Sequence, residues 1–109
     1  MIRLQLKGIP GNIKGFAIWG HARFADHGMD IVCAGVSAVV GAAIIGMIKR
    51  APGKVQYRLL PKGYIQCRIA EDLSKSAARD VQVILDTMVY GLMSIRNSYK
   101  DRINIAYRR

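Results

Sequence analysis

The stretch DIVCAGVSAVVGAAIIGMIKR, residues 30–50, decides how the rest of the chain must be arranged. An uncharged run of eighteen residues follows Asp30, a residue type that caps helix N-termini. Lys49 and Arg50 close the run as cations do in a last helical turn, and Pro52 then stops a helix. The stretch predicts one long helix. Because it is apolar around its whole circumference, we expect other elements to cover it on every side.

Small residues recur along this helix and would let a neighbouring element or another subunit approach closely: Gly35, Ala38, Gly41, Ala42 and Gly46. The run also reaches the lower length limit of a membrane-spanning helix, about 17–20 residues. However, Gly, Ala and Ser dilute its Leu, Ile and Val content, and the rest of the chain resembles an ordinary soluble fold. A buried helix of a soluble domain is therefore the favoured interpretation over a membrane span.

Strand-like segments surround this helix. Residues 2–6 alternate between apolar and polar, and a turn over GIPGN, residues 8–12, leads to a second strand over 13–19, which predicts a hairpin. KVQYRLL and GYIQCRIA, residues 54–60 and 63–70, predict a second hairpin. An amphipathic helix from about Ser74 to Arg96, capped by Asp72 or Ser74, and a fifth strand RINIAY over 102–107 complete the chain. The order ββαββαβ predicts a single α+β domain over residues 1–109, with a mixed or antiparallel sheet, two helices and the first helix buried.

Charge and cysteine content narrow the class of protein. Seventeen Lys and Arg against seven Asp and Glu give a net charge of +10 and a pI near 10.1, which favours acidic partners such as nucleic acid or a ribonucleoprotein. A hydrophobic fraction of 51% excludes global disorder. The two cysteines form neither a CxxC pair nor a disulfide framework, and no export signal is evident at the N-terminus. We therefore expect a cytoplasmic protein with reduced thiols.

One histidine and one cysteine lie where they could work together. With Asp30 as the cap, Cys33 is the third helical residue, and the unpaired N–H groups and dipole of a helix start favour the nucleophilic thiolate. His21 ends the second predicted strand, and the loop after it returns to the helix start. Its imidazole could serve as base toward the thiol and as acid toward a leaving amine. The helix-start amides could also donate to a developing oxyanion. This chemistry is acyl transfer.

Other interpretations fit the same residues. Free cysteines are often buried, so Cys33 could be a packing residue of the helix. Cys67, on the apolar face of a predicted strand, is expected in the core. His21, His27 and Cys33 could form a three-ligand metal set, although no fourth ligand and no known zinc spacing are present.

The residues around His21 and Cys33 carry a resemblance to a known family. Gly20-His21-Ala22, then Gly28, then Asp30-Ile31-Val32-Cys33-Ala34 and Val36-Ser37-Ala38 resemble the signature of the ribosomal-processing cysteine proteases, Prp. The resemblance implies a cytoplasmic, usually homodimeric endopeptidase that needs no cofactor and no metal. It implies a substrate, the N-terminal extension of large-subunit ribosomal protein number twenty-seven, whose removal next to aromatic residues supports ribosome assembly. It also implies Cys33 as the nucleophile and His21 as the general base.

Four further residues match signature positions: Asp30, Ser37, Gly20 and Gly28. Asp30 is expected to cap the helix or orient a catalytic group, and Ser37 to supply a packing or pocket hydroxyl. Gly35 stands where the family often has alanine, a change expected to loosen packing without touching the chemistry.

Substrate recognition is a separate hypothesis. The polar, glycine-containing loop over 22–29 is expected to be mobile and to close over a bound peptide. Phe24, Met29 and Tyr64 are candidate linings of an apolar pocket for the aromatic residues at the cleavage site. Two rival functions remain open. One is a non-catalytic basic ribosome- or RNA-binding module, although the chain has neither an RNP motif nor a GXXG loop. The other is a structural dimer with an incidental thiol.

Overall fold

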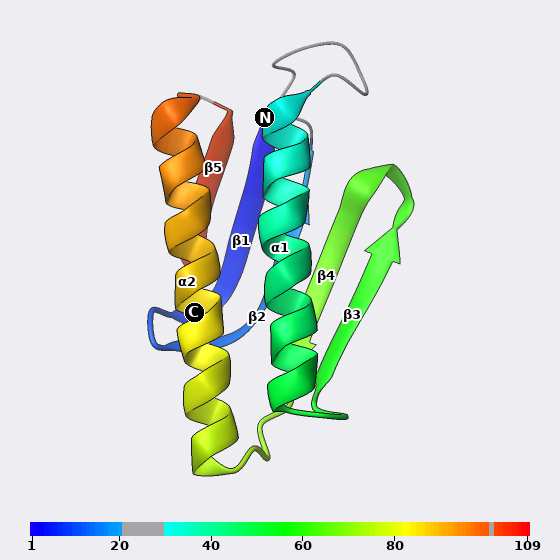
Figure 1. The fold of residues 1–109 in the computed structure, drawn as a ribbon, viewed down its shortest axis with the longest axis vertical. Coiled ribbons are helices and arrows are strands. Elements are labelled where there is room, and N and C mark those ends of the chain that lie inside the picture. Colours follow the sequence, from blue (N-terminus) through cyan, green and yellow to red (C-terminus); the bar gives the residue numbers. More distant parts are fainter. Residues whose placement is uncertain (21–29, 101) are drawn as a thin grey trace.

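The computed structural model of the chain describes residues 1–20, 30–100 and 102–109. It contains five strands, two long helices and one short 3-10 turn (Figure 1): β1 (Ile2–Ile9), β2 (Asn12–Trp19), α1 (Ile31–Arg50), β3 (Val55–Leu60), η1 (Pro61–Gly63), β4 (Tyr64–Ile69), α2 (Lys75–Ser98) and β5 (Ile103–Arg108). The predicted order ββαββαβ and the mixed α+β class are confirmed.

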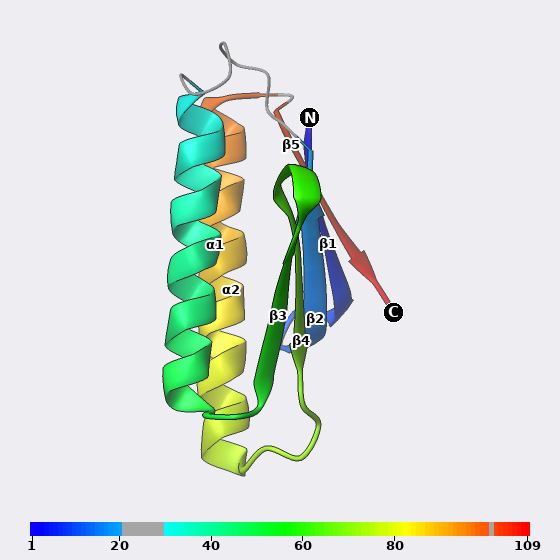
Figure 2. The same ribbon diagram turned by 90° about the vertical axis from the view of Figure 1, so that its right-hand side faces the viewer.

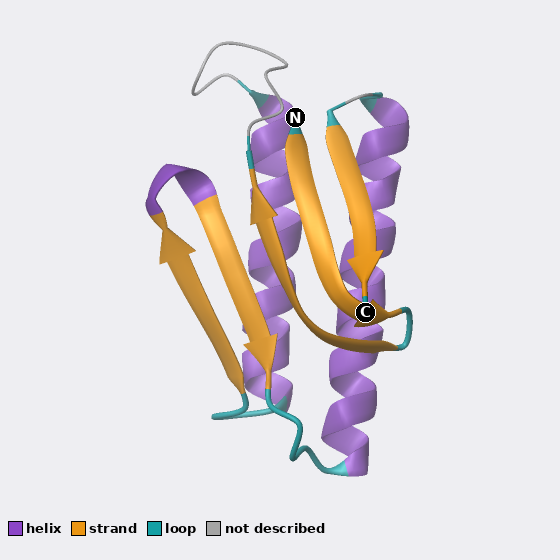
Figure 3. Ribbon diagram, turned by 180° about the vertical axis from the view of Figure 1, so that it is seen from behind, coloured by secondary structure: helices purple, strands orange, loops and turns teal. Residues whose placement is uncertain are grey.

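The strands form one sheet in the order β3-β4-β2-β1-β5. Both hairpins pair antiparallel, β2 also pairs antiparallel with β4, and β5 lies parallel to β1. The chain reaches β5 from α2, which brings it back across the sheet before the last strand begins. Figure 3 shows the sheet from the side opposite the helices, with that face uncovered.

Both helices lie on the same face of the sheet, so the molecule has two layers (Figure 2). The strands turn alternate apolar residues toward the helices, as the period of two predicts. The fully buried side chains of this core come from the sheet and from both helices: Leu4, Leu6, Ile13, Val32, Val40, Met47, Val81, Leu85, Val89 and Leu92. The predicted amphipathic face of α2 is therefore the face that is buried.

The cover over α1 differs from the expectation. Six of its residues enter the core, but the side away from the sheet is open within one chain, where Ile31 is 55% and Ile45 60% exposed. The physical reason is that a two-layer fold supplies neighbours on only some sides of a helix. By length and composition α1 could cross a membrane, yet here it packs along α2 and the sheet as a core helix does.

The start and the end of α2 lie close to the residues predicted from the sequence. Of the two candidates for the cap of α2, Ser74 is the one that serves, because its Oγ accepts from the Ala77 N–H at 3.1 Å. The helix continues two residues past the predicted Arg96, to Ser98.

Candidate active site

The start of α1 is held by the side chain of Asp30. Its Oδ1 accepts hydrogen bonds from the backbone N–H groups of Val32 at 3.0 Å and Cys33 at 3.1 Å. Its Oδ2 accepts from the Cys33 thiol, with a Sγ–Oδ2 distance of 3.4 Å. The prediction that Asp30 caps the helix and that Cys33 lies in its first turn is confirmed.

This arrangement changes the electrostatic argument for Cys33. The amides of Val32 and Cys33 donate to the Asp30 carboxylate, so the expectation that they serve a developing oxyanion is wrong for these two groups. A thiolate 3.4 Å from Oδ2 would also face a like charge. Their repulsion would be about 1 kcal/mol at the dielectric constant of water and about 5 kcal/mol at the lower effective value near a protein surface. Ionisation of Cys33 therefore needs a positive partner as well as the helix dipole.

A small apolar cavity of about 120 Å³ adjoins the thiol. Its lining includes the end of β2 and the first turn of α1. These two segments lie at the end of the sheet near the chain's N-terminus (Figure 1). The lining of the cavity comes from β1, β2, α1 and β4 with the turn before it: Ile2, Ile18, Trp19, Gly20, Cys33, Val36, Ser37, Val40, Gly63 and Ile65. Ser37, one turn along α1 from Cys33, thus lines the cavity. This position fits the second of its two predicted roles, that of a pocket hydroxyl.

Gly20 contributes to this region through its backbone. Its backbone φ is +94°, a value that residues other than glycine rarely adopt. A Cβ at this position would overlap the carbonyl oxygen of Met1. A glycine is therefore required for the chain to leave β2 in this direction, toward the predicted base.

The second thiol belongs to the core, as predicted. Cys67 on β4 is 5% exposed and lies opposite Phe16 on β2. Burial raises the pKa of its thiol to about 11, so it is almost entirely protonated at neutral pH. Of the two thiols, only half-buried Cys33 lies in the first turn of a helix, where it lines the cavity of about 120 Å³.

Tyr64 stacks on Trp19, with ring centroids 5.6 Å apart and planes inclined by 16°. Trp19 lines the cavity, so Tyr64 lies beside the predicted pocket. Sequence reasoning missed Trp19; its position directly before the Gly20-His21 pair was the available signal. Gly35 faces Ile95 on α2, and the Cβ of an alanine there would make an ordinary 3.6 Å contact with the Ile95 side chain. That the glycine leaves the chemistry untouched stays a prediction.

Several predicted site residues lie outside the part of the chain that the structure describes: His21, Phe24, His27, Gly28 and Met29. The general base, the closing loop over 22–29 and the His21, His27 and Cys33 metal set consequently stay predictions. Within residues 1–20, 30–100 and 102–109, no three His, Cys, Asp or Glu side chains gather in a way that could hold a metal ion.

Comparison with known proteins adds to this geometry. The model of the family described as cysteine protease Prp matches residues 1–104. The ribosomal processing cysteine protease Prp of Bacillus subtilis (strain 168) is 35% identical over 94 residues, covering 85% of this chain and 84% of the relative. The protein of the same name from Staphylococcus aureus (strain Mu50) is 33% identical over 101 residues, covering 90% of each chain.

The crystal structure of the essential ribosomal processing protease Prp of S. aureus, in complex with a covalently linked product peptide, has the same fold. It superposes with a TM-score of 0.85 at 26% identity, over 99% of this chain and all of that one. Family match, sequence identity and fold point to the same family. The chain belongs to the Prp family of cysteine proteases.

Proposed function

We propose that this protease removes the N-terminal extension of large-subunit ribosomal protein number twenty-seven, with Cys33 as nucleophile and His21 as general base. The observation that carries the proposal is the Cys33 thiol in the first turn of α1, hydrogen-bonded to Asp30 and lining a cavity. The names of the B. subtilis and S. aureus relatives support the ribosomal substrate, and the product peptide linked covalently to the S. aureus protein supports peptide cleavage.

The reaction follows from the chemistry of the pair. The His21 imidazole takes the thiol proton as Sγ bonds to the scissile carbonyl carbon, and the tetrahedral intermediate then expels the amine, which takes that proton from the imidazolium. Water, deprotonated by the same imidazole, attacks the resulting thioester. The C–S bond breaks, the carboxyl product leaves, and the thiol regains its proton.

Asp30 has two parts in this scheme. As the cap it fixes the first turn of α1 and hence the position of Sγ. When the thiol proton leaves, Sγ and the Asp30 carboxylate are two negative groups side by side, so an imidazolium between them would be attracted to both. We infer that Asp30 orients His21 in its protonated form.

The pocket for the aromatic residues of the substrate lies, in this proposal, against the Trp19–Tyr64 stack and the predicted linings Phe24 and Met29. The support is that Trp19 is shared between the stack and the cavity at Cys33. A substrate ring could extend the stack in an offset arrangement.

We also propose a cytoplasmic homodimer. The open side of α1 presents a stripe of apolar and small residues at helical spacing, Ile31, Ala34, Ala38, Ala42 and Ile45, all exposed in the single chain. A second copy would cover this stripe, as the expectation of cover on every side requires. The cytoplasm suits a nucleophile that must stay reduced.

The test is cleavage of a peptide spanning the extension by wild type, Cys33→Ala and His21→Ala. Mass spectrometry of the products should place the cut just before the mature sequence and next to an aromatic residue. Both variants should fold and be inactive. Cleavage by Cys33→Ala would end the proposal, and wild type that binds RNA but cuts nothing would favour the non-catalytic module.

A further inference from the structure

The face of the sheet turned away from the helices is cationic, because its strands carry Lys and Arg but no Asp or Glu. The five strands contain six Lys and Arg and no Asp or Glu, and all six are exposed or half-exposed: Arg3, Lys7, Lys14, Arg58, Arg68 and Arg108. Both ion pairs among the described residues, Arg50–Asp80 and Lys54–Asp72, lie outside the strands. The sheet cations therefore have no strand carboxylate to neutralise them.

The pairing register brings these cations together although they are far apart in sequence. One row across the sheet reads Arg68, Gly15, Lys7 and Arg108, from β4 through β2 and β1 to β5. Arg68 and Lys7 are two strands apart, a backbone separation of about 10 Å. Because Gly15 between them has no side chain, the surface between Arg68 and Lys7 is recessed, with a cation on either side.

A second row has amides on both sides of a small residue, with Gln66, Ala17 and Gln5 following one another across the sheet beside Arg58. Both rows, apart from Arg108 at the end of the first, line an open hollow of about 1200 Å³. Glu71 and Asp72 lie at its edge, and Asp72 is paired with Lys54 at 2.7 Å. Cations suited to phosphates thus alternate with amides that can donate to and accept from the edges of bases.

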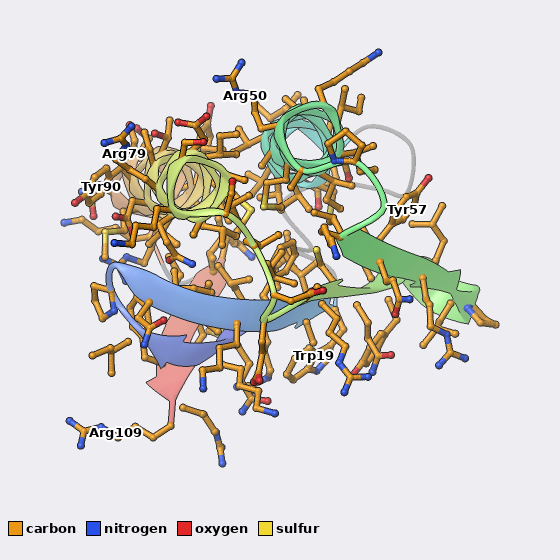
Figure 4. All side chains as sticks on the ribbon, turned by 90° about the horizontal axis from the view of Figure 1, so that it is seen from below. Trp19, Arg50, Tyr57, Arg79, Tyr90 and Arg109 are labelled. Carbon is orange, nitrogen blue, oxygen red and sulfur yellow. The ribbon has the colours of Figure 1, made fainter. Side chains whose placement is uncertain are left out.

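An aromatic pair stands at one end of the same face. Trp19 is paired with Arg3 across β1 and β2, and the Trp19–Tyr64 stack joins β2 to β4. Figure 4 shows Trp19 on the side of the sheet opposite the helices, whereas Arg50 and Arg79 lie on the helix side. Aromatic rings on a basic sheet are what unstacked bases bind.

We propose that this sheet face binds single-stranded RNA, with Lys7, Arg68 and neighbouring cations on the phosphates and the Trp19–Tyr64 stack beneath a base. Charge complementarity selects a polyanion, and the amides with the aromatic pair select nucleic acid over a membrane surface. The inference goes beyond peptide cleavage. It would place the protease next to ribosomal RNA while α1 stays free. Because Trp19 also lines the Cys33 cavity, a base on the stack and an aromatic residue of the peptide would exclude each other there.

The experiment uses the full chain carrying Cys33→Ala, so that the outcome is independent of proteolysis. Binding of a fluorescein-labelled twelve-nucleotide RNA is followed by anisotropy between 50 and 200 mM salt. The double variant Lys7→Gln/Arg68→Gln is compared with Lys49→Gln/Arg79→Gln, which removes the same charge from exposed positions of the helix layer. Circular dichroism checks that both are folded.

If Lys7→Gln/Arg68→Gln loses two phosphate contacts, the slope of log K for RNA binding against log salt concentration should become less steep by about 1.4. This change is equivalent to about 25-fold weaker binding at 0.1 M salt. The helix-layer variant should lose less than threefold. Since Trp19 is the one tryptophan in the sequence, its fluorescence should be quenched as RNA saturates the protein.

Three results would overturn the proposal. Equal losses in the two double variants would show attraction by net charge alone. Equally tight binding of polyglutamate or of phosphatidylglycerol vesicles, lost in the sheet variant, would assign the face to an acidic protein or a lipid surface. Unchanged Trp19 emission at saturation would remove the aromatic pair from the RNA path.

Discussion

Replacing Gly20 with alanine should damage the active site more than its small size suggests, and Gly11 provides a matched comparison. Both glycines have positive φ, +94° at Gly20 and +84° at Gly11, so both alanine variants carry a left-handed backbone cost of about 1–2 kcal/mol. A Cβ at Gly11 would meet nothing within 4 Å, whereas at Gly20 it would overlap the Met1 carbonyl oxygen.

The overlap cannot be relieved by a side-chain rotation, because both atoms are fixed by backbone. The last rung between β1 and β2 must open or the exit of β2 must turn, and either change moves the chain that leads to His21. We expect Gly20→Ala to lose about 3 kcal/mol in free energy of unfolding and Gly11→Ala about 1–2 kcal/mol.

Urea unfolding measures the free energy of unfolding of the two variants. Peptide cleavage, under conditions where both variants remain folded, measures their activity. The rate of cleavage should fall at least tenfold in Gly20→Ala and stay near wild type in Gly11→Ala. Equal stability and equal activity in the two variants would refute the reasoning that Gly20 sets the geometry of the site.

Four further predictions concern single residues. Asp30→Asn should keep the melting temperature, because asparagine caps as well as aspartate, but lower the cleavage rate as far as Asp30→Ala does; full activity in Asp30→Asn would reduce Asp30 to a cap. In the native protein at pH 8, Cys67 should react with iodoacetamide about 100-fold more slowly than an ordinary thiol, since its pKa is about 11 against a usual 9.0, and ready labelling would contradict its burial. The raised pKa of Cys67 means that the folded state holds the proton more tightly, so about 2–3 kcal/mol of stability present below pH 9 should be lost between pH 9 and 11, and urea titrations of wild type and Cys67→Ala over this range should differ. Ile45→Lys on the open side of α1 should shift the protein to monomer in light scattering, whereas Ile9→Lys, at a β1 residue with 45% exposure, should not; a dimer in both would place the interface elsewhere.

Much of the fold could be predicted from local patterns. Asp30, the uncharged run after it and the cations at its end defined α1 without any knowledge of the sheet. The alternation from Ile2 to Leu6 and the spacing of apolar residues on α2 likewise followed from single-element periodicity.

What depended on the arrangement of elements could not be predicted. The parallel pairing of β5 with β1 and the open side of α1 follow from how the layers assemble. The same holds for the row that unites Lys7, Arg68 and Arg108, because it needs the strand order. Within the site, the sequence predicted Asp30 and Cys33 in one helical turn. The side-chain conformation of Asp30, which the sequence does not give, brings its carboxylate into hydrogen bonds with the amides of the first turn and with the thiol.

The most direct test of the account is the rate at which Cys33 is alkylated by iodoacetamide at pH 6.5 in wild type and in His21→Ala, read by mass spectrometry of the labelled peptide. If the imidazole supplies the positive charge that a thiolate beside Asp30 requires, wild type should react at least ten times faster than His21→Ala. Equal rates in the two proteins would contradict a Cys33–His21 pair.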